Sequence, residues 1–312
     1  MSESHGVGKR TTLHDAIAAL VHDGDTIVIE GFTHLICFAA GHEIIRQRRR
    51  DLTLCRLTPD LIYDQMIAAG CARKLVFSWA GNPGAGSLHA FRRAVEGAVD
   101  GAGTGPRIEI EEYSHFGMVA RLCAGAAGLP FWPLRDFAGT DLPKANPRIA
   151  SVTCPYTGER LATVPALNPD VTIIHAQRAD AEGNTQIWGL LGVQREAALA
   201  ARRVIVVVEE LVDAAVIRAD PNRTVLPGFA VDAVVVEPWG AHPSYAQGYY
   251  DRDNAFYIGW EAISRDPRRL EEYLETYVYG VADRAGYLAA QPALAERLTA
   301  EPRICAGVNY GY

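Results

Sequence analysis

The residues best suited to chemistry in this sequence follow the ends of short apolar runs that are typical of strands. In "TIVIEGFTH", Gly31, Phe32, Thr33 and His34 come directly after such a run. Glycine lets the backbone approach a ligand closely, and the free N–H groups at the start of a following helix can hold an anion. From the residues alone a plain structural turn is the favoured interpretation, and we keep these four residues as candidate substrate contacts.

A second polar loop, "SWAGNPGAGS", follows the apolar run "KLVF". Its glycines would let backbone N–H groups cradle a phosphate or a carboxylate. Ser78, Gly81 and Asn82 are its candidate contacts to a small ligand. The loop lacks the Lys-Ser/Thr ending of a P-loop and the spacing of a dinucleotide fingerprint, so we expect a small-ligand loop and not a nucleotide motif.

His115 opens the apolar segment "HFGMVARLCAGAAG", directly after the acidic stretch "EIEEYS". Ser114 is the natural N-cap of a helix there, which puts the imidazole of His115 at the first helical position. This position follows a strand-like run, and open α/β proteins bind their ligands beyond the carboxyl ends of such strands. Residue type and position alone leave a structural and a catalytic histidine both open.

A fourth loop, "EPWGAHPSYAQGYYDRDN", contains His242 and Ser244, a combination that can act as base and nucleophile. No Gly-x-Ser-x-Gly elbow surrounds the serine, and Pro243 restrains the turn. We therefore expect an ordered, tyrosine-rich structural loop.

These loops lie between strand-like and helix-like segments that alternate along the chain. The alternation predicts an α/β fold with an open, mostly parallel sheet covered by helices on both faces. From 139 to 170 the sequence is rich in proline, glycine and threonine, which predicts a small β hairpin or flap subdomain. We expect a tail at 1–11, one domain at 12–295 that includes the flap, and a second tail at 296–312.

The composition is that of a globular protein and argues against several partners. Of the 312 residues 49% are hydrophobic, and 30 basic against 37 acidic side chains leave a net charge of −7. This balance disfavours nucleic acid, and the basic run "RQRRR" suits the C-terminal end of a helix. No apolar stretch reaches the ~18 residues of a membrane span. Six scattered cysteines indicate reduced thiols, so we expect a cytoplasmic protein with no metal site and no tightly bound cofactor.

Taken together, the loops resemble the A (α) subunit of family I coenzyme A transferases, most closely the glutaconate CoA-transferase type. The resemblance rests on the order of five blocks. These are "VHDGDTIVIEGFTH", "IEEYSHFGM" with "AGAAGLPFWPLR", "ATVPALNPDVTIIHAQRADAEGNTQIWG", "ADPNRTVLPGFAVDAVVVEPWGAHPS" and "YYDRDNAF". The resemblance implies the fold described above and the transfer of coenzyme A between an acyl-CoA and a small carboxylic acid.

Some residues depart from the family pattern. Glu30 stands where the first loop usually has a glycine, and "LICFAAGHE" lacks the Gly-x-Pro that normally follows. His115 stands where the family commonly has a glutamine that helps to bind the acyl group near its carbonyl oxygen. The resemblance thus implies an oxyanion contact or an acid–base role for His115, and it matches Asn82 with a substrate-side segment.

The resemblance also implies that the catalytic nucleophile lies on another chain. Family I enzymes attack the thioester with a glutamate carboxylate and pass through a glutamyl-CoA intermediate. In two-chain members this glutamate lies in a Ser-Glu-Asn-Gly-like stretch of the B (β) subunit, and this sequence has no such stretch. We therefore expect a chain that is active only with a B subunit, in an α2β2 or larger assembly.

Two alternatives to the transferase stay open. The first keeps the fold and changes the reaction, and the second is a ligand-sensing module. Relatives with the same fold include hydrolases that open rings of CoA-linked intermediates in steroid degradation, and decarboxylases of acyl-CoA substrates. An imidazole at position 115 can carry a proton near neutral pH, whereas a glutamine cannot. The ligand-sensing module predicts an attached helix-turn-helix, and none precedes Thr12.

Overall fold

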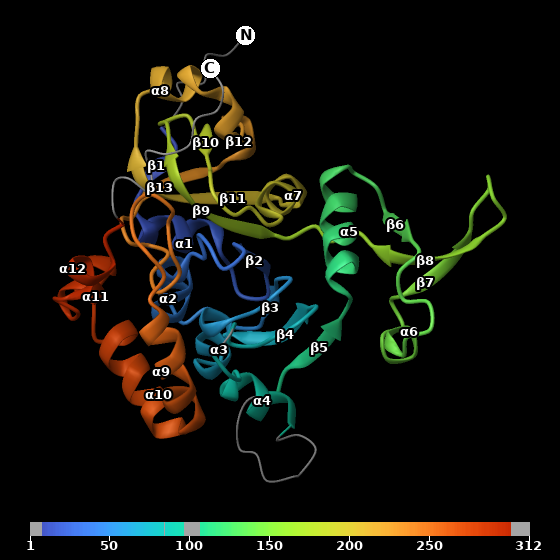
Figure 1. The fold of residues 1–312 in the computed structure, drawn as a ribbon, viewed down its shortest axis with the longest axis horizontal. Coiled ribbons are helices and arrows are strands. Elements are labelled where there is room, and N and C mark those ends of the chain that lie inside the picture. Colours follow the sequence, from blue (N-terminus) through green and yellow to red (C-terminus); the bar gives the residue numbers. More distant parts are fainter. Residues whose placement is uncertain (1–7, 84, 97–106, 301–312) are drawn as a thin grey trace.

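The computed structural model describes residues 8–83, 85–96 and 107–300 (Figure 1). Within these ranges the central element is a 10-stranded sheet. Its strands are β1 (Arg10–Thr11), β2 (Thr26–Glu30), β3 (Leu52–Cys55), β4 (Ala72–Phe77), β5 (Glu109–Glu112), β9 (Val171–Ala179), β10 (Thr185–Gln186), β11 (Arg203–Leu211), β12 (Thr224–Leu226) and β13 (Ala233–Val236). The order β1-β13-β11-β9-β2-β3-β4-β5 is parallel throughout, and β10 pairs antiparallel with β9 and β12.

The central strands of this sheet are buried on both faces, because consecutive residues point into two different cores. In β11, Ile205 and Val207 belong to one core, and Val206 and Val208 belong to the other. Such runs of β-branched residues are typical of parallel sheets that are covered on both sides. The expected α/β fold is therefore confirmed.

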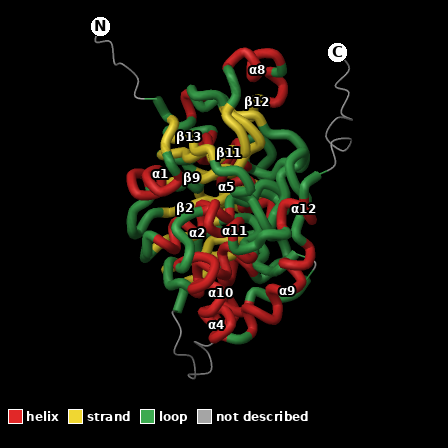
Figure 2. The backbone as a smooth tube through the Cα atoms, turned by 90° about the vertical axis from the view of Figure 1, so that its left-hand side faces the viewer, coloured by secondary structure: helices red, strands yellow, loops and turns green. Residues whose placement is uncertain are grey.

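Helices supply the two covering layers. They are α1 (Leu13–Leu20), α2 (Phe38–Arg46), α3 (Leu61–Ala68), α4 (His89–Glu96), α5 (His115–Ala126), α6 (Leu142–Ala145), α7 (Gln194–Ala200), α8 (Ala214–Ala219), α9 (Asn254–Arg265), α10 (Pro267–Leu274), α11 (Arg284–Ala289) and α12 (Leu294–Leu298), with 3-10 turns at Pro221–Arg223 and Gly228–Ala230 and a π-helical turn at Glu275–Tyr279. Residues of α1, α2, α3, α4, α9 and α10 share one core with the sheet, and residues of α5 and α7 share another. Figure 2, seen from the left-hand side of Figure 1, shows α2, α10 and α11 toward the viewer.

A separate three-stranded antiparallel sheet forms the flap, which projects beyond α5 (Figure 1). Its strands are β6 (Phe131–Leu134), β7 (Ala150–Thr153) and β8 (Arg160–Pro165), in the order β6-β8-β7. The hairpin expected between 139 and 170 corresponds to β7 and β8. The third strand, β6, lies before this range and was not expected, because its pairing with β8 joins segments far apart in the sequence.

One expected domain boundary lies between two regular elements, and the other lies inside a helix. β1 pairs with β13, so the sheet begins before the boundary expected at Thr12. α12 crosses the boundary expected at 295. The remaining tail residues, 1–7 and 301–312, lie outside the described residues. Over the described ranges, no helix combines the length and the apolar character needed to cross a membrane.

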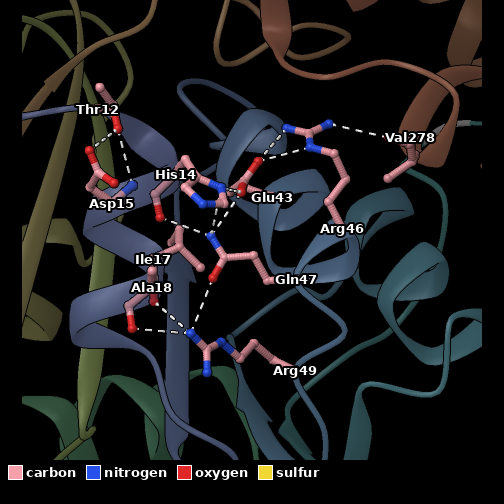
Figure 3. A network of polar contacts seen from close by, with 10 residues as sticks. All are labelled: Thr12, His14, Asp15, Ile17, Ala18, Glu43, Arg46, Gln47, Arg49 and Val278. Atoms are coloured by element: carbon pink, nitrogen blue, oxygen red, sulfur yellow. Dashed lines mark hydrogen bonds and ion pairs between the residues drawn. The ribbon is translucent and has the colours of Figure 1, made fainter.

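The arginines near the end of α2 are used within the molecule (Figure 3). Arg46 Nε donates to Glu43 Oε2 at 2.8 Å, and Arg49 Nη2 donates to the carbonyl oxygen of Ala18 at 3.1 Å. Glu43 Oε1 lies 2.8 Å from His14 Nδ1 on α1. The contacts of Glu43 and Arg49 tie α2 to α1, so these side chains have a structural role.

Gly125 on α5 lies where a side chain does not fit. A Cβ atom there would be 2.3 Å from the carbonyl oxygen of Leu167 and 2.9 Å from the Cβ of Ala200 on α7. Because the Leu167 contact is with backbone, α5 has to move away from its neighbours to admit a methyl group. We predict that Gly125→Ala lowers the free energy of unfolding by about 2 kcal/mol, measured by urea denaturation followed by circular dichroism.

Gly259→Ala is the matched control for this prediction. Gly259 lies within α9, and no atom is within 4 Å of an added Cβ. Alanine is favoured over glycine in a helix by about 0.5–1 kcal/mol, so this variant should be more stable than the wild type. If both variants were stabilised alike, the close packing of α5 would be refuted.

Candidate functional site

Hydrogen bonds join the loops at the carboxyl ends of β2, β3 and β4. Arg56, which follows β3, donates from Nη2 to the carbonyl oxygen of Gly31, which follows β2. Ser78, which follows β4, donates from its hydroxyl to the carbonyl oxygen of Leu57 at 2.5 Å. Since β2, β3, β4 and β5 are neighbours in the sheet, their loops form one continuous edge of the kind that binds ligands in open α/β proteins. The structure thus brings the two predicted glycine-containing loops to the same edge.

The loop after β2 turns back tightly at Gly31. A Cβ atom at this position would lie 2.6 Å from the carbonyl oxygens of both His34 and Leu35. Thr33 and Leu35 each have a φ of 56°, in the left-handed region that disfavours residues with a side chain. Ser244 holds the turn by donating to the carbonyl oxygen of Thr33 at 2.8 Å. The loop is therefore a strained backbone structure that its surroundings keep in place.

His34 fixes this loop from inside the protein. Its side chain is fully buried, with Nδ1 3.0 Å from the carbonyl oxygen of Leu190 and Nε2 3.0 Å from the backbone nitrogen of Gln247. The N–H of Gln247 makes Nε2 the acceptor, so the ring proton lies on Nδ1 and is donated to Leu190. Burial lowers the pKa of His34 to about 4, which keeps the ring neutral. Both ring nitrogens are used by the backbone, so a substrate contact of His34 stays a prediction.

Ser78, Gly81 and Asn82 lie on the loop after β4 in different surroundings. Gly81 is buried against the indole of Trp79, because an added Cβ would be 2.5 Å from that ring. Asn82 is 1% exposed and donates from Nδ2 to the carbonyl oxygen of Tyr257 on α9 at 2.6 Å. Ser78 is half-buried. The substrate contacts of these three residues also stay predictions.

His115 stands at the first position of α5, where the sequence predicts it. The Ser114 hydroxyl accepts the N–H of Gly117 at 2.9 Å and so caps the helix, and the same hydroxyl donates to Asp136 in the turn after β6. His115 and Phe116 are both exposed. In the described part of the chain no hydrogen bond engages the His115 ring. This imidazole is therefore available to a ligand or to a second chain.

A buried charged cluster beneath the loop after β2 was not predicted from the sequence. Glu30, Arg56 and Asp60 are exposed by 2%, 1% and 1%. Arg56 Nη1 donates to Asp60 Oδ1 at 3.0 Å. Burial raises the pKa of Glu30 to about 7, against the opposing effect of Arg56. The sequence did contain a signal for this cluster, because two opposite charges, Arg56 and Asp60, closely follow an apolar strand.

Exposed apolar side chains surround the same edge. They follow β2, β4 and β10 or lie in the first turn of α5, with exposures from 37% to 54%. They are Phe32, Trp79, Phe116, Leu190 and Leu191. Gln177 holds the last of these loops by donating from Nε2 to the carbonyl oxygen of Trp188 at 2.8 Å. Exposed apolar patches rimmed by polar groups mark interaction sites, and we call these five residues the apolar rim.

His242 and Ser244 do not form a nucleophile pair. His242 is buried, with Nε2 3.1 Å from Asp253 Oδ2 and Nδ1 2.9 Å from the hydroxyl of Tyr287. Burial lowers the pKa of His242 to about 4, so the ring stays neutral. Ser244 donates instead to Thr33. This loop is the ordered structural loop that the sequence predicts.

The carboxyl edge offers an exposed imidazole and an apolar rim, which can contact an acyl group. The backbone N–H groups of Ser78, Gly81 and Asn82 are donated to carbonyl oxygens within the chain and are not free for an anion. Among the described residues, no three His, Cys, Asp or Glu side chains gather as a metal ion would require. The fold and this edge define an open α/β protein whose carboxyl edge carries an exposed, largely apolar rim.

Several known proteins share these features. The family model "Coenzyme A transferase" matches residues 10–237. The chain is 55% identical over 278 residues to the A subunit of 3-oxoadipate CoA-transferase from Pseudomonas knackmussii, over 89% of this chain and 96% of that protein. The crystal structure of glutaconate CoA-transferase from Acidaminococcus fermentans is similar with a TM-score of 0.87 and 32% identity, over 94% of this chain and 96% of that chain. A variant of the decarboxylase AibA/AibB gives a TM-score of 0.71 and 31% identity, over 86% and 99%.

The chain belongs to the coenzyme A transferase family. This finding confirms the resemblance carried by its five sequence blocks. The chain is accordingly of the type that forms the A (α) subunit in heteromeric CoA-transferases.

The tight turn at Gly31 generates a prediction for the site. We predict that Gly31→Ala lowers kcat/KM for CoA transfer at least about tenfold, because a methyl group there collides with two carbonyl oxygens and displaces the loop. Steady-state kinetics of the variant in its complete complex measures the effect. Gly259→Ala, with open space around its Cβ, should keep the wild-type rate. If Gly31→Ala kept the wild-type kcat/KM, the loop after β2 would not be part of the active site.

Proposed function

We propose that this chain is the A (α) subunit of a CoA-transferase that moves coenzyme A between an acyl-CoA and 3-oxoadipate. The observation that carries the proposal is the 55% identity, over 89% of the chain, to the corresponding chain of a 3-oxoadipate CoA-transferase. The thioester of coenzyme A is a substrate in this reaction, and no tightly bound cofactor is required. The carboxyl edge carries the exposed imidazole of His115 and the hydrogen-bonded loop after β2, and this arrangement suits an acyl substrate.

The proposed reaction runs through carboxylate chemistry on the partner chain. In the first step a B-subunit glutamate carboxylate attacks the thioester carbonyl, and the C–S bond breaks to give an acyl-glutamyl anhydride and CoA thiolate. The thiolate attacks the glutamyl carbonyl of the anhydride, which releases the first acid as a carboxylate and leaves a glutamyl-CoA thioester. The second acid then reverses these steps and leaves as its CoA thioester. This chain has no Ser-Glu-Asn-Gly stretch to supply the glutamate.

His115 and the loops contribute to the same reaction by stabilising charge. His115 contacts the acyl carbonyl oxygen, where negative charge develops when the thioester is attacked. The segment Gly31 to His34, together with Ser78, Gly81 and Asn82, borders the substrate. Removing one donor to such an oxyanion typically costs ~10²–10³ in rate.

The apolar rim supports a site that is shared with the B subunit. Its side chains surround the edge and are exposed in the isolated chain, and a partner that covers them would also exclude water from the reaction. We propose an α2β2 or larger assembly that acts in the cytoplasm. The five cysteines in the described part of the chain are all unpaired, which suits a reducing compartment.

The role of His115 can be tested by mutation. We predict that His115→Ala lowers kcat of the purified complex at least about tenfold, because the acyl oxygen loses a contact in the transition state. The exposed position predicts that fold and assembly are unchanged, which size-exclusion chromatography checks. His115→Gln, with the residue common in the family, should recover part of the rate. Near-normal turnover of the alanine variant would make His115 a structural residue.

The position of the nucleophile can be tested by trapping. We predict that incubating the complex with acyl-CoA and borohydride inactivates it, and that mass spectrometry finds the modified glutamate on the B subunit. This chain should carry no modification and should show no transfer activity alone. A complex that turns over acyl-CoA without any trapped glutamate would refute the covalent transferase mechanism and favour the hydrolase alternative.

A further inference from the structure

Glu30 is a buried acid at the carboxyl end of β2 whose Oε2 has no hydrogen-bond partner in the described part of the chain. Its neighbours Arg56 and Asp60 also carry unpartnered buried atoms, at Nε and Oδ2. Buried polar atoms without partners are uncommon, and each requires an explanation. A cluster of them beneath a predicted substrate loop points to a functional role.

Glu30 also lies against a second loop of the same edge. Its Oε1 would be 3.3 Å from a Cβ atom added at Gly192, and that Cβ would be 3.0 Å from the Cβ of Phe32. Gly192 N–H donates to Gln194 Oε1 at 2.6 Å, while Gln194 Nε2 has no partner among the described residues. Glu30 is thus placed between the loop after β2 and the loop before α7.

The buried charges nearest to Glu30 already include a paired cation and anion, so an ionised Glu30 brings negative charge in excess of positive. Arg56 is a buried cation, and Asp60, its ion-pair partner at 3.0 Å, is a buried anion. Glu196 on α7 contributes further negative charge. Burial raises the pKa of Tyr63 on α3, so this neighbour stays neutral. Ionised Glu30 therefore adds an uncompensated negative charge at the carboxyl edge.

This charge would affect substrate binding through the loop after β2. Arg56 also donates to the carbonyl oxygen of Gly31, so the cluster is bonded to the loop that borders the proposed acyl site. The acid substrate is a carboxylate throughout the neutral pH range. A negative charge buried beneath its site repels it with little screening, because salt screens buried charges weakly.

We propose that Glu30 is a proton-linked positioning residue of the CoA-transfer site, which favours binding of the anionic acid when it is neutral and opposes binding when it is ionised. This inference rests on the proposed function. Glu30 acts through the loop and through Arg56 and does not contact the reacting atoms.

The direction of the pH dependence follows from the burial of Glu30. Its pKa is raised from 4.5 to about 7, so the group becomes ionised as the pH passes through neutrality. The KM for the acid should therefore rise with pH across this range, while kcat changes less. The folded protein holds this proton more tightly than the unfolded chain, so the contribution to stability is full below 4.5 and is lost as the pH rises to about 7.

Steady-state kinetics of the complete A–B complex with Glu30→Gln tests the proposal. The KM for 3-oxoadipate is measured at saturating acyl-CoA between about pH 6 and pH 8.5, where the substrate carboxylates stay ionised. We predict a rise of about fivefold to tenfold for the wild type. In Glu30→Gln the KM should stay near its low-pH value, because glutamine keeps the shape of the neutral acid. A wild-type KM that does not change with pH, or a variant that keeps the wild-type rise, would overturn the proposal.

Asp64→Asn is the matched control. Asp64 is another fully buried acid, and burial raises its pKa to about 6, but its two carboxylate oxygens accept hydrogen bonds from Phe91 on α4 and Trp260 on α9. Its replacement should change stability without removing the rise in KM. Thermal unfolding at the same pH values checks folding, and Glu30→Gln should lose less stability than the wild type as the pH rises. If Asp64→Asn removed the rise in KM as well, the effect would not be specific to Glu30.

Asp60→Asn supplies a second, independent variant. Asp60 raises the pKa of Glu30 and Arg56 lowers it, so removal of the aspartate charge should move the midpoint of the KM profile to lower pH. An unmoved midpoint would count against Glu30 as the titrating group.

Failure of the wild-type complex to transfer CoA at any pH would refute the proposed function. Calorimetric binding of the acid to wild-type and Glu30→Gln complexes would then decide the role of Glu30.

Discussion

The buried guanidinium of Arg56 is the interaction on which the carboxyl edge of this protein depends. It binds the carbonyl oxygen of Gly31 and the carboxylate of Asp60, and so joins the loops after β2 and β3. A buried charge is tolerated only when it is paired and hydrogen-bonded, and removing one member strands the others. The tight turn at Gly31, and with it the loop that borders the site, is therefore held in part by the hydrogen bond from Arg56 Nη2.

Further hydrogen bonds connect the other loops of this exposed edge. Ser78 joins the third loop to the second, and His34 joins the first loop to the segment around Leu190. The loops are thus positioned before any substrate or second chain arrives, and a pre-set arrangement reduces the entropy lost on binding. The polar groups are used inside the edge, and the side chains left at its surface are mostly apolar, which suits one half of a shared site.

Local rules predicted several parts of the site from the sequence. The cap formed by Ser114 and the place of His115 at the start of a helix follow from neighbouring residues alone. The parallel sheet follows from apolar runs that are buried on both faces. The strand β6 was missed because it pairs with β8, a long way along the chain, and no local pattern marks such a partner. The same reason hid the pairing of Arg56 with Gly31.

The sequence by itself determined the fold class, the family and the loops that contain candidate residues, because these depend on periodic burial, on caps and on the order of motifs. Only the tertiary structure decided which of those residues are free to act. It engaged both nitrogens of His34 with backbone groups and left the imidazole of His115 exposed. It also enclosed Glu30 beside Arg56 and Asp60, where burial changes its acidity. Burial and charge pairing arise from residues distant in the chain, so they appear only when the fold brings those residues together.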